Sequence, residues 1–140
     1  MENGSWLENG SAASMSITSP IGSQMQVLTL PLPPSVNGLF AGKGRRYLSK
    51  EYKSWREVAG WELAQQRPRK CLGKVSLTFE VREPPTRRAE DISNRLKAAE
   101  DLLVSHGIIE GDSQHFVRRI VLEWSDQVEG IRITINAWEG

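Results

Sequence analysis

A chain of 140 residues with 39% hydrophobic and 25% charged residues predicts one globular domain built on a single hydrophobic core. No apolar run is long enough to cross a membrane, no signal peptide opens the chain, and the only cysteine, Cys71, excludes an internal disulfide. We therefore expect a protein of the reducing cytoplasm, with no membrane partner.

The formal net charge of +1 hides a basic middle of the chain. Residues 41–100 hold fifteen Lys or Arg against eight Asp or Glu, which gives this segment a net charge of +7. Such a charge suits binding to a phosphate backbone, because cations on one surface attract a polyanion. Taken alone, it more often marks a surface whose mixed charges only keep the protein in solution.

Residues 1–24 are rich in Gly, Ser and Asn and show no sustained periodicity. They are expected to be a disordered leader, or sequence added ahead of a natural start at Met15 or Met25. The folded domain is therefore expected to occupy residues 25–140.

A first strand is predicted at residues 24–32, where two prolines follow. After a turn-rich loop come Lys43, Arg45 and Arg46, next to glycines that leave the backbone N–H groups accessible. These cations are candidates for contacts with a phosphate backbone, although a basic solvent-exposed loop fits equally well. The segment is not a P-loop, because it lacks the glycine spacing and the Lys-Ser/Thr ending.

A first helix is predicted at residues 50–66, with Ser49 as its N-cap. Its apolar residues recur at helical spacing and define the buried face: Trp55, Val58, Ala59 and Leu63. Lys53 and Arg56 face elsewhere. Trp61 lies off the apolar stripe. Its indole is expected to pack against a neighbouring element or a partner subunit, and core filling is the favoured role.

Residues 74–82 alternate apolar and polar side chains and form the clearest predicted strand. Arg87 and Arg88 follow it and bring two cations next to an acidic segment. Two further strands are predicted at residues 115–124 and 131–138. The order strand, helix, strand, helix, strand, strand predicts an α/β (α+β) fold: one small domain with a mixed β-sheet flanked by two main helices.

The second helix is predicted to begin after Asp91, whose short side chain is expected to accept hydrogen bonds from the free N–H groups of the first turn. Its buried face is defined by apolar residues at helical spacing: Ile92, Leu96, Ala99 and Leu103. Asn94, Lys97 and Asp101 are three and four residues apart, so they share another face. Gly107 is expected to end the helix.

Beyond this helix, Ile108 and Ile109 are expected to return the chain to the core and leave Asp112 on an exposed loop. Such a path brings Asp91 and Asp112 together beside Lys97, a composition that suits a metal and phosphate site. Each residue alone has a simpler explanation, with Asp91 as a helix cap and Lys97 as a solvated cation.

The other ionisable residues nearby lack the spacing of a metal site. They are expected to be structural or solvent-exposed: Glu100, Asp101, His106 and His115. Cys71 has no neighbouring base and is expected to be structural. No Ser-His-Asp elbow, HExxH, CxxC or GxGxxG motif occurs, which excludes several classes of enzyme and gives no sign of a small-molecule cofactor.

Three segments carry a resemblance to a known family. They are LTLPLPPSVN with the following GKGRRYLSKEYKSWR, then DISNRLKAAEDLL, and finally GIIEGDSQ. The second is similar to the pattern D-x-D-N-x-x-K-A and the third to G-x-x-x-D-D-x-Q. Together, over residues 26–138, they resemble the RusA family of Holliday-junction resolvases, small homodimeric endonucleases common in bacterial prophages.

The resemblance implies roles for four residues of the second and third segments. Asp91 and Asp112 match aspartates that bind a divalent metal in the family, Mg²⁺ or Mn²⁺. Lys97 matches a lysine that assists catalysis. Asn94 matches the family's asparagine and is a candidate for a further metal contact or for a contact to a metal ligand.

Two positions depart from the family pattern. Ser93 stands where the family has a second aspartate, and Gly111 stands where it has the first aspartate of the loop. Each change removes a hard oxygen ligand and a negative charge. We expect Ser93 to reach the metal through its hydroxyl or a water, with Glu90 or Glu110 as sources of the missing charge.

The implied function is metal-dependent resolution of four-way branched DNA by paired cuts, made by a homodimer in recombination and repair. Flanking phosphates would be held by the basic residues of two segments: Lys43, Arg45, Arg46, Arg87 and Arg88. A second hypothesis is a weakened or inactive junction-binding protein, because Ser93 replaces an aspartate. A third is a small interaction domain unrelated to DNA, which the basic middle of the chain and the three motifs disfavour.

Overall fold

Residues 25–35, 40–41, 47–85 and 89–139 are described by a computed structural model of the chain. Within them, four strands form one mixed sheet in the order β1 (Met25–Leu30), β6 (Ile131–Ala137), β4 (Val75–Arg82) and β5 (Val117–Ser125). β4 and β5 run parallel, whereas β6 is antiparallel to both β1 and β4. Each strand lies within two residues of its predicted bounds.

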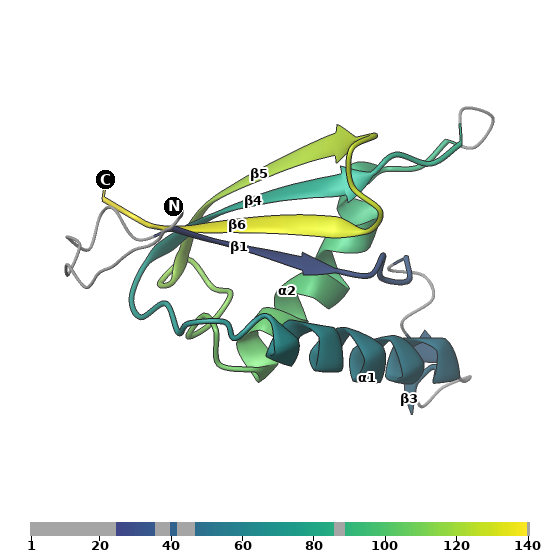
Figure 1. Ribbon diagram of the computed structural model, residues 1–140, viewed down its shortest axis with the longest axis horizontal. Coiled ribbons are helices and arrows are strands. Elements are labelled where there is room, and N and C mark those ends of the chain that lie inside the picture. The colour runs from purple at the N-terminus through teal and green to yellow at the C-terminus, as the bar shows by residue number, and fades with distance from the viewer. Residues whose placement is uncertain (1–24, 36–39, 42–46, 86–88, 140) are drawn as a thin grey trace, which may run out of the picture.

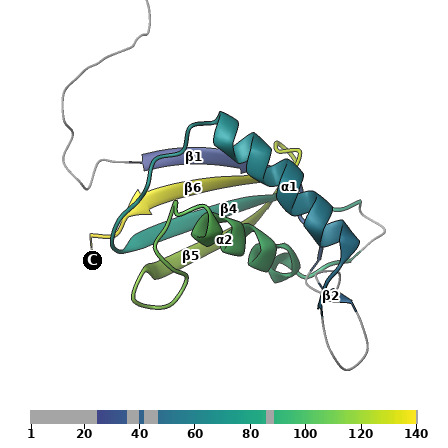
Figure 2. The same cartoon turned by 90° about the horizontal axis from the view of Figure 1, so that it is seen from below.

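Two helices, α1 (Lys50–Gln65) and α2 (Leu96–Ser105), cover one face of this sheet and leave the other face open (Figures 1 and 2). A short ribbon of β2 (Phe40–Ala41) and β3 (Tyr47–Leu48) precedes α1. The predicted α/β (α+β) domain with one mixed sheet and two main helices is therefore confirmed. The leader predicted at residues 1–24 lies outside the described residues.

The core lies between the sheet and the two helices. Alternate residues of β4 and β6 are buried there, as the period of two in their sequences predicts. The buried set from these strands is Val75, Leu77, Phe79, Val81, Ile131, Ile133 and Ile135. None of these side chains is more than 1% exposed, so the paired strands β4 and β6 form the centre of the fold.

The open face of the sheet carries a cross-strand ion pair. Glu80 of β4 is directly opposite Arg132 of β6, and its carboxylate accepts two hydrogen bonds from the guanidinium at 2.6 and 2.9 Å. These bonds lower the pKa of Glu80 below its ordinary value of 4.5. A carboxylate whose pKa is lowered by folding stabilises the protein above its unfolded pKa and loses that contribution as the pH falls through the folded value.

We therefore expect Glu80→Gln to reduce the free energy of unfolding by roughly 0.5 kcal/mol at pH 7, the scale of a solvent-accessible cross-strand pair. The difference should shrink at a pH well below 4.5, as the carboxylate of the wild-type protein is protonated. Urea unfolding at both pH values measures this. An equal difference at both would assign the effect to packing rather than to charge.

Helix α1 begins as predicted after Ser49, whose Oγ accepts a hydrogen bond from the backbone N–H of Tyr52 at 3.0 Å. It ends at Gln65, one residue before the predicted end. Arg67 then takes a positive φ of 52°, the left-handed conformation that is common at the residue after a helix C-cap.

Two predictions about the faces of α1 are wrong. Val58 is 51% exposed and Trp61 is 65% exposed, so neither fills the core. The buried face instead includes Tyr52, which precedes Trp55 by one turn and extends the stripe through Ala59. Only the side of α1 that faces the sheet is covered by described residues, and a residue next to the stripe is turned by about 100° away from it.

The segment predicted as one second helix divides into two elements. Ile92–Arg95 forms a 3₁₀ turn, η3, and the α-helical part begins only at Leu96. Arg95, at the boundary, donates hydrogen bonds to the Glu90 carboxylate and to the Pro33 carbonyl. We attribute the tighter first turn to these tertiary contacts, which fix the side chain of the residue at the junction.

The end of α2 follows the prediction. Gly107 has a φ of 71°, and its N–H donates to Val104 at 3.0 Å, while the N–H of Ile108 donates to Leu103 at 2.9 Å. This pair of hydrogen bonds is the Schellman motif, which needs a residue that tolerates positive φ. Ile108 and Ile109 are both buried, as expected, and return the chain to the core. None of the helices in the described part of the chain has the length and apolar character needed to span a membrane.

Candidate functional site

Lys97 lies between two carboxylates that come from different parts of the chain. Its Nζ is 3.0 Å from Asp101 Oδ1, one turn later on α2, and 3.8 Å from Asp112 Oδ2 on the loop after the helix. The three side chains remain 54%, 37% and 40% exposed, so a large ligand can reach them. The predicted meeting of Lys97 and Asp112 is therefore present in the fold.

The electrostatic surroundings keep Lys97 charged. The hydrogen bond to Asp101 raises the pKa of the Lys97 ammonium, burial opposes this rise, and Asp101, Asp112 and Glu100 add further attraction. An ammonium whose pKa lies above its ordinary value is protonated at neutral pH. Lys97 is therefore suited to stabilise negative charge and not to act as a base.

The loop that carries Asp112 is fixed at both ends by backbone contacts. On one side Ile109 pairs with Cys71 in a parallel bridge, and the N–H of Cys71 donates to Ile108 at 2.7 Å. On the other side, the N–H groups of Phe116 and Val117 both donate to the carbonyl of Ser113 and lead into β5. This anchoring holds the loop after α2 so that Asp112 lies back beside the helix, close to Lys97.

Asp91 does not act as the side-chain cap that the sequence predicts. Its backbone carbonyl accepts the N–H of Asn94 at 3.0 Å, but its carboxylate caps no N–H group of η3. The carboxylate also makes no hydrogen bond or ion pair with any other residue that the structure describes. Asp91 and Ser93 are both exposed at the start of η3. A polar side chain without a structural partner is available to a ligand.

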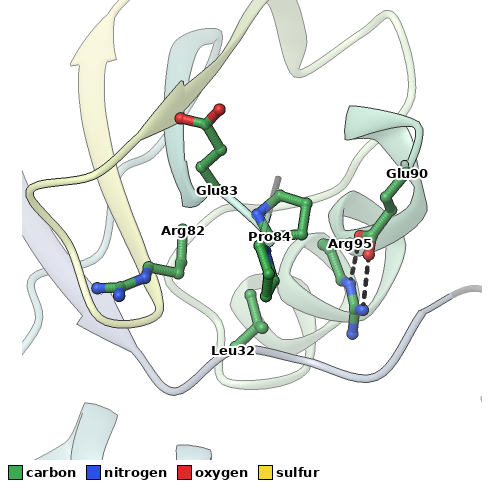
Figure 3. Close-up of a pocket in the computed structure, with 7 residues that line it drawn as sticks. Leu32, Arg82, Glu83, Pro84, Glu90 and Arg95 are labelled. Atoms are coloured by element: carbon green, nitrogen blue, oxygen red, sulfur yellow. Dashed lines mark hydrogen bonds and ion pairs between the residues drawn. The ribbon is translucent and has the colours of Figure 1, made fainter. Parts of the chain in front are cut away.

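The two further carboxylates considered for the metal have structural partners. Glu90 forms a paired contact with Arg95, at 2.7 and 3.0 Å, and only 9% of its side chain is exposed (Figure 3). Glu110 accepts a hydrogen bond from the backbone N–H of Gly73. These contacts give both side chains a role in holding loops together.

A cavity of about 260 Å³ lies beside the Glu90–Arg95 pair, and Leu32, Arg82 and Glu83 also line it (Figure 3). Its two arginines are already bound to protein acceptors, because Arg95 also donates to Pro33 at 2.6 Å and Arg82 donates to Val128 at 3.2 Å. We therefore assign this cavity to the packing of loops and not to a ligand.

The described residues contain no group of three or more His, Cys, Asp or Glu side chains arranged to hold a metal ion. The metal-binding roles of Asp91, Ser93 and Asp112 stay predictions. The five cations predicted to hold DNA lie outside the described residues: Lys43, Arg45, Arg46, Arg87 and Arg88.

Comparison with known proteins places this chain in a family. The family model described as endodeoxyribonuclease RusA matches residues 31–136, which include Asp91, Lys97 and Asp112. The chain belongs to the RusA family. It is also 26% identical, over 119 residues, to a protein of Aquifex aeolicus (strain VF5) named crossover junction endodeoxyribonuclease RusA. That similarity covers 83% of this chain and 92% of the relative.

Glu100 is electrostatically coupled to the candidate site around Lys97, which the sequence did not reveal. We expected an ordinary surface residue, but Glu100 is partly buried, and this burial raises the pKa of its carboxyl group. The negative charges of Asp112 and Asp101 raise the pKa further, and Lys97 opposes them. The only sequence signal is its spacing, three residues after Lys97 on the same helix. Asp101, also expected to be ordinary, is the hydrogen-bond partner of Lys97.

The histidines and the cysteine agree with their expected roles. His106 and His115 are exposed, and neither belongs to a metal-binding group among the residues described. Cys71 accepts a hydrogen bond on its sulfur from Gln26 Nε2 at 3.0 Å, next to its backbone bridge to Ile109.

The ring of Phe116 leaves little room for a side chain at Gly111, where the resemblance implies an aspartate. A Cβ atom built on Gly111 would lie 2.8 Å from Cδ2 and 3.1 Å from Cε2 of the Phe116 ring. Carbon atoms at van der Waals contact are about 3.5–4.0 Å apart, so the ring occupies the space that a side chain at residue 111 needs.

We therefore expect Gly111→Asp alone to destabilise the protein by about 1–3 kcal/mol, the usual cost of overpacking. The double variant with Gly111→Asp and Phe116→Ala should lose less stability than the sum of the losses of the two single variants. Thermal unfolding of the four proteins measures the coupling between the two positions. Strictly additive effects would show that the ring and the missing side chain do not compete for one space.

Proposed function

We propose that this protein is a metal-dependent endodeoxyribonuclease that resolves Holliday junctions by paired, symmetric cuts. Membership of the RusA family supports hydrolysis of DNA, and the name of the Aquifex aeolicus relative points to the crossover junction. The structural observation that carries the proposal is the contact of Lys97 with Asp112, which joins a cation to an exposed carboxylate at the surface.

Lys97 stabilises charge at the scissile phosphate in this proposal. Hydrolysis of a phosphodiester develops negative charge on the phosphate oxygens and on the leaving oxygen, and a fixed cation lowers the energy of that state. Lys97 is held by Asp101 at 3.0 Å, so its ammonium is positioned before DNA binds. A cation that is already oriented reorganises little during the reaction.

Asp91 and Asp112 would hold a divalent cation, Mg²⁺ or Mn²⁺, with Ser93 as a further oxygen ligand. The donor chemistry fits, because these ions prefer hard oxygen ligands, and Mg²⁺ often takes one or two carboxylates together with water and substrate phosphates. Both carboxylates are exposed, and that of Asp91 caps no helix. When bound, the ion supplies Lewis acidity at the phosphate and makes water easier to deprotonate.

A homodimer suits the proposed substrate. A four-way junction has nearly two-fold symmetry and requires two cuts, so two identical sites related by a two-fold axis match it. Lys43, Arg45, Arg46, Arg87 and Arg88 would hold the flanking phosphates. Affinity for the junction should then fall steeply as the salt concentration rises.

The second candidate is a protein that binds junctions without cutting them. It is favoured by Ser93, which replaces an aspartate, and by the lack of a three-ligand metal group among the described residues. It predicts salt-sensitive binding to branched DNA and no cleavage under any divalent metal.

Cleavage of a synthetic four-way junction with Mg²⁺ or Mn²⁺ separates the two candidates. We expect paired nicks across the junction that disappear in Asp91→Asn and on addition of EDTA, whereas binding to the junction survives both changes. Duplex DNA of the same sequence is the control substrate. Tight binding with no nicks under either metal would exclude the nuclease and leave the binding protein.

A further inference from the structure

A groove that carries two cations and one carboxylate at its rim lies between α1 and α2. Its volume is about 360 Å³, and it is lined by Lys53, Arg56, Glu57, Leu102 and His106. Leu102 is buried and forms the floor, whereas the four ionisable side chains are exposed at the rim. Figure 2 shows the two helices side by side on the same face of the sheet.

The two cations of the groove are available to an anion. Lys53 and Arg56 form no ion pair with any residue in the described ranges, although both lie close to Glu57 in sequence. The guanidinium carbon of Arg56 lies 5.7 Å from the centre of the Tyr52 ring. This cation–π contact restrains the side chain and leaves its N–H groups free to donate to phosphate oxygens.

Tyr52 joins the groove to the site around Lys97. It is 5% exposed, and burial raises the pKa of its hydroxyl group. The charge of Asp101 raises that pKa further, while Arg56 and Lys97 lower it. The same phenol is thus within electrostatic reach of Arg56 from α1 and of the Lys97–Asp101 pair from α2.

At the other end of the groove the two helices approach each other closely, and Gly60 permits this approach because it has no side chain. A Cβ atom at Gly60 would lie only 3.1 Å from Nε2 of His106, the residue that caps the C-terminal end of α2. His106 is therefore packed against the backbone of α1. The groove is a fixed feature of the packing between the two helices.

We propose that this groove binds the phosphodiester backbone of a duplex arm of the junction, with Lys53 and Arg56 contacting phosphates next to the one held at Lys97. This inference rests on the proposed function and extends it to residues outside the catalytic site. Contacts of this kind position the DNA without reading its sequence. Glu57 on the same rim repels the backbone and limits the affinity of the groove.

The test measures binding of a labelled four-way junction in EDTA, by fluorescence anisotropy, over a range of salt concentrations. In the variant with both Lys53→Gln and Arg56→Gln, we expect the slope of log K against log salt to become shallower by about 1 for each lost phosphate contact. The matched control combines Lys74→Gln and Arg119→Gln, which remove the same charges away from the groove. Arg119 of β5 is the register partner of Ser76 of β4, on the open face of the sheet. The control should keep a steeper slope than the groove variant.

A variant that is expected to bind more tightly provides a second test, because misfolding would weaken binding and not strengthen it. Glu57→Gln removes the repelling charge, so it should tighten binding to the junction. An unchanged affinity in Glu57→Gln together with an unchanged salt slope in the Lys53 and Arg56 variant would overturn the groove as a binding site.

The result also separates this inference from the proposed function. If the wild-type protein binds and cuts junctions but the groove variants behave as wild type, the inference fails and the nuclease stands. If the wild-type protein neither binds nor cuts branched DNA, both fail. Binding that depends on the groove in a protein without cleavage supports the inference and favours the binding-protein candidate.

Discussion

Replacing Lys97 by methionine should lower the rate of junction cleavage by about 10²–10³-fold, the effect of removing one donor that stabilises a developing charge. Methionine keeps the length and apolar stem of the lysine but removes its charge. Asp101 and Asp112, which flank Lys97 at 3.0 and 3.8 Å, would remain without a cation between them. The expected loss lies in the chemical step, because the neutral variant cannot stabilise the transition state.

Single-turnover cleavage of a preformed complex isolates this step from binding. Lys74→Met is the matched control, because Lys74 is an exposed lysine at the start of β4 and does not contact the carboxylates around Lys97. Its rate should equal that of the wild-type protein. A Lys97→Met variant that cuts at the wild-type rate would remove Lys97 from the catalytic machinery.

The pH dependence of cleavage gives a second check on the role of Lys97. Asp101 raises the pKa of Lys97 above its ordinary value of 10.5, so the ammonium stays charged throughout the neutral and mildly alkaline range. Cleavage should therefore not decline between about pH 7 and pH 9 through loss of this charge. A decline in that range that is present in the wild-type protein and absent in Lys97→Met would contradict the assignment.

Gly130→Ala should be among the most destabilising single substitutions in the chain, with a loss of about 3 kcal/mol at the upper end of overpacking effects. A Cβ atom at Gly130 would overlap the carbonyl oxygen of Leu30 and lie 2.8 Å from the N atom of Leu32 and 2.9 Å from the carbonyl carbon of Pro31. These are backbone atoms, so rotation of a side chain cannot relieve the contact. The carbonyl of Gly130 also accepts the N–H of Arg82 at 2.9 Å, so a shift here disturbs three strands.

Gly73→Ala is the control for this prediction. Gly73 has a φ of 82°, but a Cβ atom there would meet no atom within 4 Å. Its replacement should cost only the backbone strain of positive φ, roughly 1 kcal/mol. Urea unfolding of the two variants gives the free energy lost through atomic overlap in Gly130→Ala and through backbone strain in Gly73→Ala. Equal losses would show that the chain at Gly130 moves aside without disturbing the sheet.

Elements whose cause is local were predictable from the sequence. Ser49 starts α1 because its hydroxyl accepts an N–H three residues away, and Gly107 ends α2 because it tolerates positive φ. The alternation in β4 identifies a strand with one buried face, because side chains of a strand point to opposite sides of a sheet. Lys97 and Asp112 could be placed together because the two motifs that contain them occur at a known spacing.

Several features depend on contacts that no local pattern contains. The carboxylate of Asp91 is not a cap, and the first turn after it is 3₁₀. Arg95 at the end of this turn is held by Glu90, five residues earlier, and by Pro33 from a distant part of the chain. The charge of Asp112 acts on Glu100 only because the loop after α2 folds back toward the helix.

The sequence by itself determined the mixed sheet, its two helices and the motifs of the RusA family, because these follow from hydrophobic period, turn chemistry and residue spacing. Only the tertiary structure decided which surfaces remain exposed. Trp61 is open to solvent and Tyr52 is buried because the sheet covers one side of α1 alone. Periodicity shows which residues share a face, whereas burial depends on the neighbouring element that packs against that face.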